Sequence, residues 1–128
     1  MNYKKTYIAN PERYAEGMMN YRTCGKSGIV LPEISLGFWW NFGGVDVYEE
    51  SLAKMTYAFD HGITCFDLAN NYGPPFGSAE ETFGKMYSEN FKSHRHEMII
   101  TTKAGYHMWE GPYGQGSSRK MLVTSLEE

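Results

Sequence analysis

Short apolar segments alternate with amphipathic helical segments along this sequence, and the alternation constrains the fold more than any other feature. Residues 34–37, 63–67 and 98–102 are predicted strands, and helical patterns begin near residues 46, 78 and 118. Strands that alternate with helices at this spacing are typical of βα units in a parallel sheet. The sequence therefore predicts an α/β fold with about three βα units.

The starts of the first two helices carry capping signals. Asp46 is followed three residues later by Glu49, and Ser78 is followed in the same way by Glu81. This spacing is that of a capping box, in which the first side chain accepts a hydrogen bond from the first helical turn. We therefore expect Asp46 and Ser78 to cap the two helices, and Gly62 to end the first.

Two further segments precede the first βα unit. Residues 1–20 are polar and aromatic without a clear period, and they are predicted to be an N-terminal extension that either lies on a core or is partly disordered. Residues 21–24 and 29–31 flank a turn bounded by Gly25 and Gly28, a pattern typical of a β-hairpin. The remaining residues, 21–128, are predicted to form one unit.

Composition excludes several classes of function. A net charge of −3 and a sequence pI of about 5.8 provide no basic face for nucleic acid. No segment is apolar enough for a signal peptide or a membrane span. Cys24 and Cys65 make no disulfide framework, so a cytoplasmic location is expected. His94 and His96 lie in a charged stretch typical of a solvated helix end, and no metal site is expected.

Three polar residues follow the predicted strands in a pattern that suggests chemistry. Asp67 ends the second strand, Lys103 follows the third, and Tyr72 is five residues beyond Asp67. Sequential parallel strands are usually neighbours, about 4.8 Å apart, so the two charges should pair at the loop-bearing edge of the sheet. An ammonium beside a phenol favours the phenolate, which would make Tyr72 a proton donor. The ordinary alternative is an ion pair at two strand ends, with a tyrosine packed on a loop.

An aromatic pair, Trp39 and Trp40, follows the first predicted strand. Such a pair at the end of a strand can plug a barrel, stack on a planar ligand or bind a partner. The sequence alone leaves these three alternatives open.

These motifs together resemble those of the aldo-keto reductases. Residues 67–72 fit the D-x-A-x-x-Y motif of that family, residues 77–84 fit the helix start that follows it, and residues 100–103 fit its lysine-bearing strand. Residues 21–28 are similar to the hairpin that closes the floor of the barrel. The resemblance implies that this chain is the N-terminal part of a (β/α)8 TIM barrel.

The resemblance implies a catalytic role for three residues and NADPH as the cofactor, bound without a Rossmann domain. Tyr72 would donate a proton to the substrate carbonyl, Lys103 would make Tyr72 a stronger acid, and Asp67 would hold Lys103 in place. Trp39 and Asp67 match positions near the cofactor.

On weaker grounds, Trp40 and Tyr106 are candidates for binding a small-molecule carbonyl substrate. Within the family, residues 9–14, 70–75 and 103–114 look most like the bacterial L-glyceraldehyde 3-phosphate reductase branch. The implied reaction is reduction of aldehydes or ketones such as glyceraldehyde 3-phosphate. That branch is related to the potassium channel β-subunits, so a non-catalytic regulatory or binding role is the alternative. Phe38 departs from the threonine that is common beside Trp39 in those channel relatives.

The family pattern is only partly present. A complete barrel needs roughly 250 residues and eight strands, whereas residues 21–128 resemble a partial barrel that stops in its third helix. The catalytic histidine of the family follows a fourth strand that this sequence does not contain. The resemblance therefore implies that these residues are inactive alone. Open sheet edges predict self-association, a complementary chain that completes the barrel, or poor order.

Overall fold

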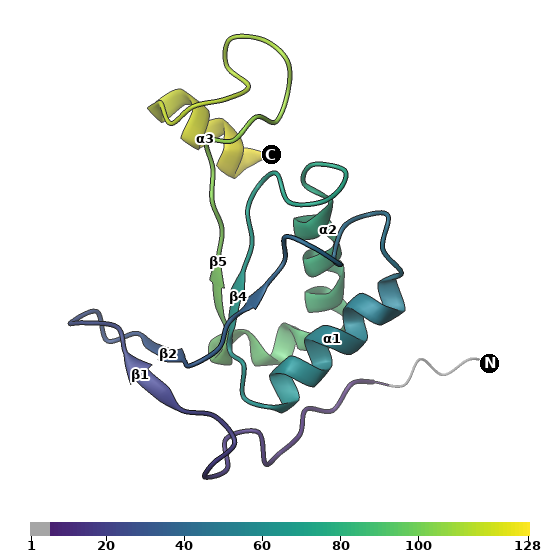
Figure 1. The fold of residues 1–128 in the computed structure, drawn as a ribbon, viewed down its shortest axis with the longest axis vertical. Coiled ribbons are helices and arrows are strands. Elements are labelled where there is room, and N and C mark those ends of the chain that lie inside the picture. The colour runs from purple at the N-terminus through teal and green to yellow at the C-terminus, as the bar shows by residue number, and fades with distance from the viewer. Residues whose placement is uncertain (1–5) are drawn as a thin grey trace.

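A parallel sheet forms the centre of the molecule (Figure 1). The computed structural model describes residues 6–128. Strands β3 (Leu36–Gly37), β4 (Cys65–Asp67) and β5 (Ile99–Thr101) pair in the order β3–β4–β5, and both pairs are parallel. The register sets Gly37 opposite Asp67, and Asp67 opposite Thr101. The predicted βα units and α/β class are confirmed.

Helices occupy two regions relative to this sheet. Helices α1 (Tyr48–Asp60) and α2 (Ser78–Met86) lie on one side of it, and the chain leaves α2 through a π-helical turn, η1 (Tyr87–Phe91), and a 3-10 segment, η2 (Lys92–Glu97). Helix α3 (Arg119–Glu127) lies beyond the carboxyl end of β5, at the top of Figure 1. Within residues 6–128, no helix combines the length and the apolar character needed to cross a membrane.

The core lies between α1, α2 and the sheet. Met55 and Phe59 of α1 are fully buried, and so is Met86 of α2, as their helical spacing predicts. Phe66 of β4 meets these helices from the sheet, because alternate residues of a strand point to opposite faces. The buried cluster has these members: Ala9, Phe38, Phe42, Met55, Phe59, Phe66, Leu68, Ala79, Phe83, Met86, Phe91 and Met98.

The prediction that Asp46 caps α1 is wrong. The residue at the cap position is Val47, and no side chain caps the first turn. Asp46 instead accepts a hydrogen bond at 2.8 Å from the backbone N–H of Gly43, three residues earlier. Its carboxylate therefore closes the turn before the helix. The end of α1 is as predicted: Gly62 has φ +85°, and its N–H bonds to the carbonyl of Phe59 at 3.0 Å.

The prediction that Ser78 caps α2 is also wrong. Gly77 occupies the cap position with φ +86°, and Ser78 is the first helical residue. The Ser78 hydroxyl accepts from the N–H of Gly44 at 2.9 Å and donates to the carbonyl of Pro75 at 2.6 Å. It joins two loops at the carboxyl edge of the sheet, which leaves it unable to cap. In α3, by contrast, Ser118 does cap, because its hydroxyl accepts from the N–H of Met121.

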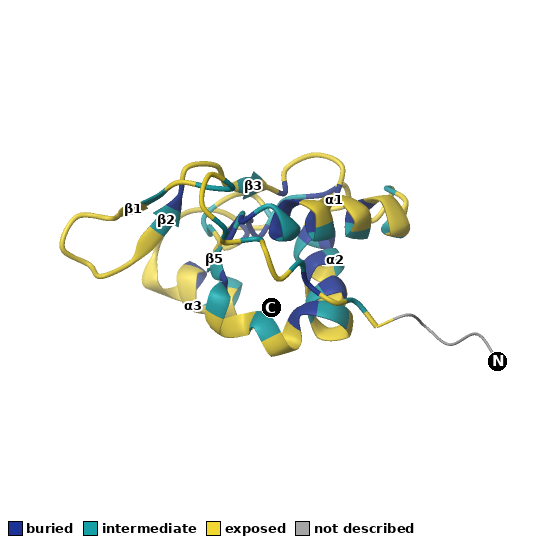
Figure 2. Cartoon of the chain, turned by 90° about the horizontal axis from the view of Figure 1, so that it is seen from below, coloured by how far each residue is buried: buried dark blue, intermediate teal, exposed yellow. Residues whose placement is uncertain are grey.

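The predicted hairpin is present near the amino ends of the parallel strands. Strands β1 (Tyr21–Thr23) and β2 (Val30–Pro32) pair antiparallel, and most of the hairpin is exposed (Figure 2). The Tyr21 hydroxyl donates to the carbonyl of Gly62 at 2.6 Å, between α1 and β4. This bond ties the hairpin to the first βα unit.

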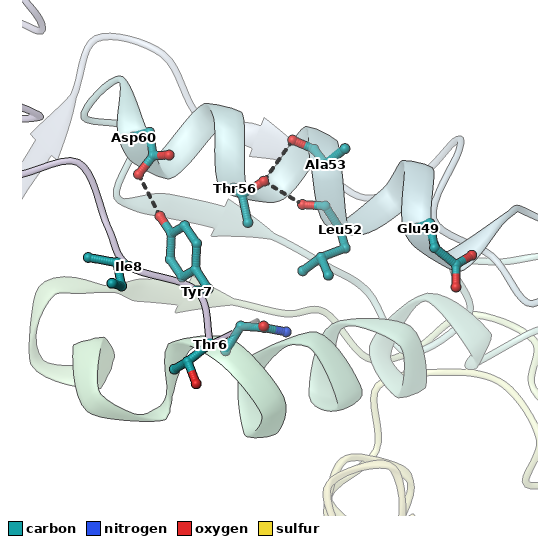
Figure 3. Close-up of a pocket in the computed structure, with 9 residues that line it drawn as sticks. Thr6, Tyr7, Ile8, Glu49, Leu52, Ala53, Thr56 and Asp60 are labelled. Carbon is teal, nitrogen blue, oxygen red and sulfur yellow. Dashed lines mark hydrogen bonds between the residues drawn. The ribbon is translucent and has the colours of Figure 1, made fainter. Parts of the chain in front are cut away.

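The segment before the hairpin lies along α1 and η2. The Tyr7 hydroxyl donates to Asp60 at 2.6 Å, at the end of a groove lined by the N-terminal segment, α1 and Asn90 (Figure 3). Further along, Arg13 pairs with Glu97 at 2.5 Å. Residues 7–13 therefore lie on the core. This is one of the two alternatives that we expected for the N-terminal extension. Residues 1–5 of that predicted extension lie outside the described residues.

Candidate active site

Asp67, Tyr72 and Lys103 meet at the carboxyl edge of the sheet. Asp67 is the last residue of β4, Lys103 lies two residues beyond β5, and Tyr72 comes from the loop that joins β4 to α2. The Lys103 ammonium donates to Asp67 Oδ2 at 2.8 Å and to the Tyr72 hydroxyl oxygen at 3.2 Å. The structure thus brings together the three residues that the sequence predicted to converge.

The carboxylate of Asp67 has a hydrogen-bond donor for each of its oxygens. Lys103 occupies Oδ2, and the Thr101 hydroxyl donates to Oδ1 at 2.6 Å. The hydrogen bonds from Lys103 and Thr101 hold the pKa of Asp67 below its usual value, against the smaller opposing effect of burial. Asp67 is therefore an anion at neutral pH.

Lys103 has three hydrogen-bond acceptors within the chain. Besides Asp67 and Tyr72, its ammonium donates to the backbone carbonyl of Leu68 at 2.8 Å. Burial alone would lower the pKa of Lys103, but the hydrogen bonds with Asp67 and Tyr72 outweigh it and the pKa is raised. The site thus contains a fixed cation next to a phenol.

The loop that carries Tyr72 is fixed by close backbone contacts. The N–H of Ala79 in α2 donates to the carbonyl of Tyr72 at 3.1 Å, and the N–H of Gly44 donates to the carbonyl of Pro74 at 2.9 Å. A Cβ on Gly43 would lie 2.5 Å from that same Pro74 oxygen, so only glycine permits this approach. These contacts lock the β3–α1 and β4–α2 loops together and position Tyr72.

Three aromatic rings stack beside this cluster, beginning with Tyr72. The rings of Trp39 and Tyr72 lie 6.0 Å apart with planes 8° from parallel, and Trp40 continues the stack at 6.0 Å and 12° from Trp39. Trp39 is 62% exposed and Trp40 is 66% exposed. The pair therefore does not plug the interior in this structure, and it presents an open aromatic face beside Lys103.

Tyr106, a predicted substrate contact, lies apart from this hydrogen-bonded cluster. It belongs to the long loop between β5 and α3 and is 49% exposed. Among the interactions of the described residues, none joins it to Asp67, Tyr72 or Lys103. Thr101, conversely, contacts Asp67 and was not anticipated. Its place two residues before Lys103, the spacing at which side chains of an extended segment point the same way, was the available signal.

Other polar clusters do not enlarge this site. The groove of Figure 3 shares no residue with it. His94 is one of the two histidines that we did not expect to bind a metal, and it pairs with Glu97 at 2.6 Å. In the part of the chain that the structure describes, no group of three His, Cys, Asp or Glu side chains is placed to hold a metal ion. Cys65 is a buried free thiol.

Comparison with models of known protein families shows which family has a sequence pattern like that of this chain. The model of the aldo/keto reductase family matches residues 33–128, which contain Trp39, Trp40 and the whole of the Asp67–Tyr72–Lys103 cluster. The chain belongs to the aldo/keto reductase family. The predicted resemblance is thereby confirmed.

Two kinds of curated relative stand out within the family. The chain is 61% identical over 122 residues to "L-glyceraldehyde 3-phosphate reductase" of Escherichia coli K12, a match that covers 95% of the chain and 35% of the relative. It is 35% identical over 107 residues to "Probable voltage-gated potassium channel subunit beta" of Arabidopsis thaliana, covering 82% of the chain and 31% of that protein. The chain thus spans about a third of the length of the curated relatives it matches.

Solved structures show the same fold. An aldo-keto reductase from Bacillus halodurans in its holo form superposes with a TM-score of 0.68 at 23% identity, over 85% of the chain and 34% of that protein. A "putative aldo-keto reductase" from Pseudomonas aeruginosa gives a TM-score of 0.63 at 25% identity, over 84% of the chain and 41% of that protein. The chain therefore has the fold of the leading part of the (β/α)8 barrel in this family, as expected.

Proposed function

We propose that this chain supplies the proton-donating centre of an NADPH-dependent reductase that converts aldehydes or ketones, such as glyceraldehyde 3-phosphate, to alcohols. The observation that carries the proposal is the position of the Tyr72 hydroxyl, 3.2 Å from an ammonium that is itself fixed by Asp67 at 2.8 Å. The E. coli relative that is 61% identical is named L-glyceraldehyde 3-phosphate reductase, which supports an aldehyde as the substrate.

Reduction of a carbonyl needs a hydride on carbon and a proton on oxygen. NADPH supplies the hydride when it is bound. Tyr72 donates the proton to the developing alkoxide, and Lys103 stabilises the phenolate that remains, because a positive charge beside a phenol favours its anionic form. Asp67 contributes by holding Lys103 in hydrogen-bond contact with Tyr72.

The open aromatic face fits a planar cofactor ring and a small substrate. The indole of Trp39 is stacked on Tyr72 and is 62% exposed, so a nicotinamide can approach it beside the proton donor. Trp39 and Asp67 would contact the cofactor. Trp40 and Tyr106 would contact the carbonyl substrate, Trp40 because it extends the same stack.

We also propose that the 128 residues do not turn over substrate alone. The sheet of the described residues has three parallel strands, and β3 and β5 each pair on one side only, whereas a (β/α)8 barrel closes with eight. Self-association or a complementary chain would supply the missing strands. The proposal keeps residues 1–20 as an extension and residues 21–128 as the partial barrel, in a cytoplasmic protein whose two cysteines are free.

A hybrid enzyme tests the proposed function. This chain replaces the aligned segment of the E. coli relative, and NADPH oxidation is followed with glyceraldehyde 3-phosphate as substrate. We expect turnover by the hybrid and a loss of about a hundredfold or more in Tyr72→Phe, with NADPH affinity retained. Tyr57→Phe is the matched control, because Tyr57 is 68% exposed on α1. Full activity in Tyr72→Phe would refute the role of Tyr72.

A non-catalytic regulatory or binding subunit is the second candidate. The observation that favours it is the 35% identity to a protein named as a probable potassium channel β-subunit. A purely binding role does not require Asp67, Tyr72 and Lys103 to be connected by hydrogen bonds, so the proposed reductase remains the better reading of the site. An inactive hybrid that still binds NADPH would favour the second candidate.

A further inference from the structure

The strand register sets one side chain directly beside the Asp67–Lys103 pair. Thr101 of β5 is the register partner of Asp67 in β4. Side chains of such partners lie on the same face of the sheet, on strands about 4.8 Å apart. Lys103 lies two residues beyond Thr101, and Thr101 and Lys103 both bond to Asp67. Asp67 therefore has a donor from the same chain segment on each of its two oxygens.

We propose that Thr101 is a positioning residue for the proposed reduction: its hydroxyl fixes the Asp67 carboxylate so that the second oxygen holds Lys103 against Tyr72. The inference rests on the proposed function, because it assigns Thr101 a part in the same site. Thr101 Oγ1 donates to Asp67 Oδ1 at 2.6 Å, and Lys103 Nζ donates to Oδ2 at 2.8 Å.

Packing alone does not fix this carboxylate. The Asp67 side chain is 40% exposed and that of Lys103 is 35% exposed, so water can reach both. The terminal torsion of an aspartate is broad, with no sharply preferred value. A donor on Oδ1 is therefore what selects one orientation of the carboxylate plane. Without it, the carboxylate can rotate and leave Lys103 held opposite Tyr72 by the Leu68 carbonyl alone.

The next residue provides a matched control. Thr102 directly follows β5 and is also exposed, and its hydroxyl donates to Glu80 of α2 instead of Asp67. Thr101→Val and Thr102→Val remove the same group from adjacent positions and keep a β-branched side chain that suits a strand. A change seen only in Thr101→Val therefore reports the bond to Asp67 and not a general effect at the strand end.

The deciding measurement is an NMR pH titration of the Asp67 carboxyl carbon in the 128-residue chain, with circular dichroism at each pH to confirm the folded state. Because the Thr101 hydrogen bond favours the carboxylate, Thr101→Val should raise the Asp67 midpoint towards that of a free aspartate. Thr101→Ser should restore the parent value, and Thr102→Val should leave it unchanged. Equal midpoints in the parent chain and Thr101→Val would overturn the inference, as would a parent midpoint at the free value.

A kinetic measurement in the hybrid enzyme then separates this inference from the proposed function. Thr101→Val should lower kcat about threefold to tenfold, the size expected for one hydrogen bond to a partly exposed charge, with KM nearly unchanged. Thr101→Ser should recover it. A hybrid without turnover would count against the proposed function while leaving the NMR result valid. A shifted Asp67 midpoint with unchanged kcat would refute the positioning role.

Discussion

The ammonium nitrogen of Lys103 lies 3.2 Å from the hydroxyl oxygen of Tyr72 and 4.9 Å from the centre of its ring. The cation thus lies near the polar end of the phenol, where it acts on the O–H group directly. Its position is set from the other side by Asp67 and by the carbonyl of Leu68, both at 2.8 Å. This arrangement makes Lys103 the residue whose charge can be tested most directly.

Replacing Lys103 by methionine removes the charge and keeps much of the side-chain length. In the hybrid enzyme, we expect Lys103→Met to lower kcat for glyceraldehyde 3-phosphate about a hundredfold or more, because the phenolate left after proton transfer loses its counter-charge. NADPH affinity, measured by quenching of tryptophan fluorescence, should change much less. A variant with the parent kcat would show that the Lys103 charge has no part in catalysis.

The convergence of Asp67, Tyr72 and Lys103 was predictable because adjacent parallel strands end at one edge of a sheet. The two wrong helix caps have a common cause. Asp46 and Ser78 each bond instead to a backbone N–H in the loops at that same edge, and a sequence pattern does not reveal loop packing. Tyr106 lies in a long loop, where no period fixes the direction of a side chain.

The lowered pKa of Glu97 predicts that the folded chain loses stability at acid pH. Burial alone would raise its pKa, but hydrogen bonds from Tyr14, His94 and Arg13 outweigh burial and lower the pKa from 4.5 to about 2. A group whose pKa is depressed by folding contributes stability above its unfolded value, and that contribution is lost as the pH falls. The free energy of unfolding should therefore decrease between about pH 4.5 and pH 2, by on the order of 3 kcal/mol from this residue.

Urea unfolding at a series of pH values measures this effect. Glu97→Gln should lower stability at pH 7 and flatten the fall in stability between pH 4.5 and pH 2. Glu16→Gln is the control, since Glu16 is exposed, and it should leave the profile unchanged. An unaltered slope in Glu97→Gln would mean that Glu97 does not link the N-terminal segment to η2 in solution.

The surroundings of Gly43 and Gly84 predict opposite effects on stability when each is replaced by alanine. Gly43→Ala should destabilise the chain by roughly 1–3 kcal/mol, because its Cβ would meet backbone at 2.5 Å and must push the two loops apart. Gly84→Ala should stabilise it by roughly 0.5–1 kcal/mol, because Gly84 lies within α2 and a Cβ there meets nothing within 4 Å. Thermal unfolding of both variants checks the signs, and equal shifts would disprove the close approach.

The burial of Phe38 predicts how stability changes when it is replaced by the threonine that is common in the channel relatives. Its side chain is fully buried, and its ring lies 4.1 Å from that of Phe42 and 5.3 Å from that of Phe83. The neighbouring Trp39 is exposed beside Tyr72. Residue 38 therefore belongs to the core, and Phe38→Thr exchanges packing for a buried hydroxyl instead of adding a contact at the site.

We expect Phe38→Thr to lower the free energy of unfolding by about 3 kcal/mol or more, the cost typical of removing a buried phenylalanine. Val45→Thr, at a position that is 71% exposed, should change it by less than about 0.5 kcal/mol. Urea unfolding of the two variants provides the comparison. If Phe38→Thr were as stable as the parent, the core between α1, α2 and the sheet would not depend on this ring. Residue 38 would then not be buried in solution.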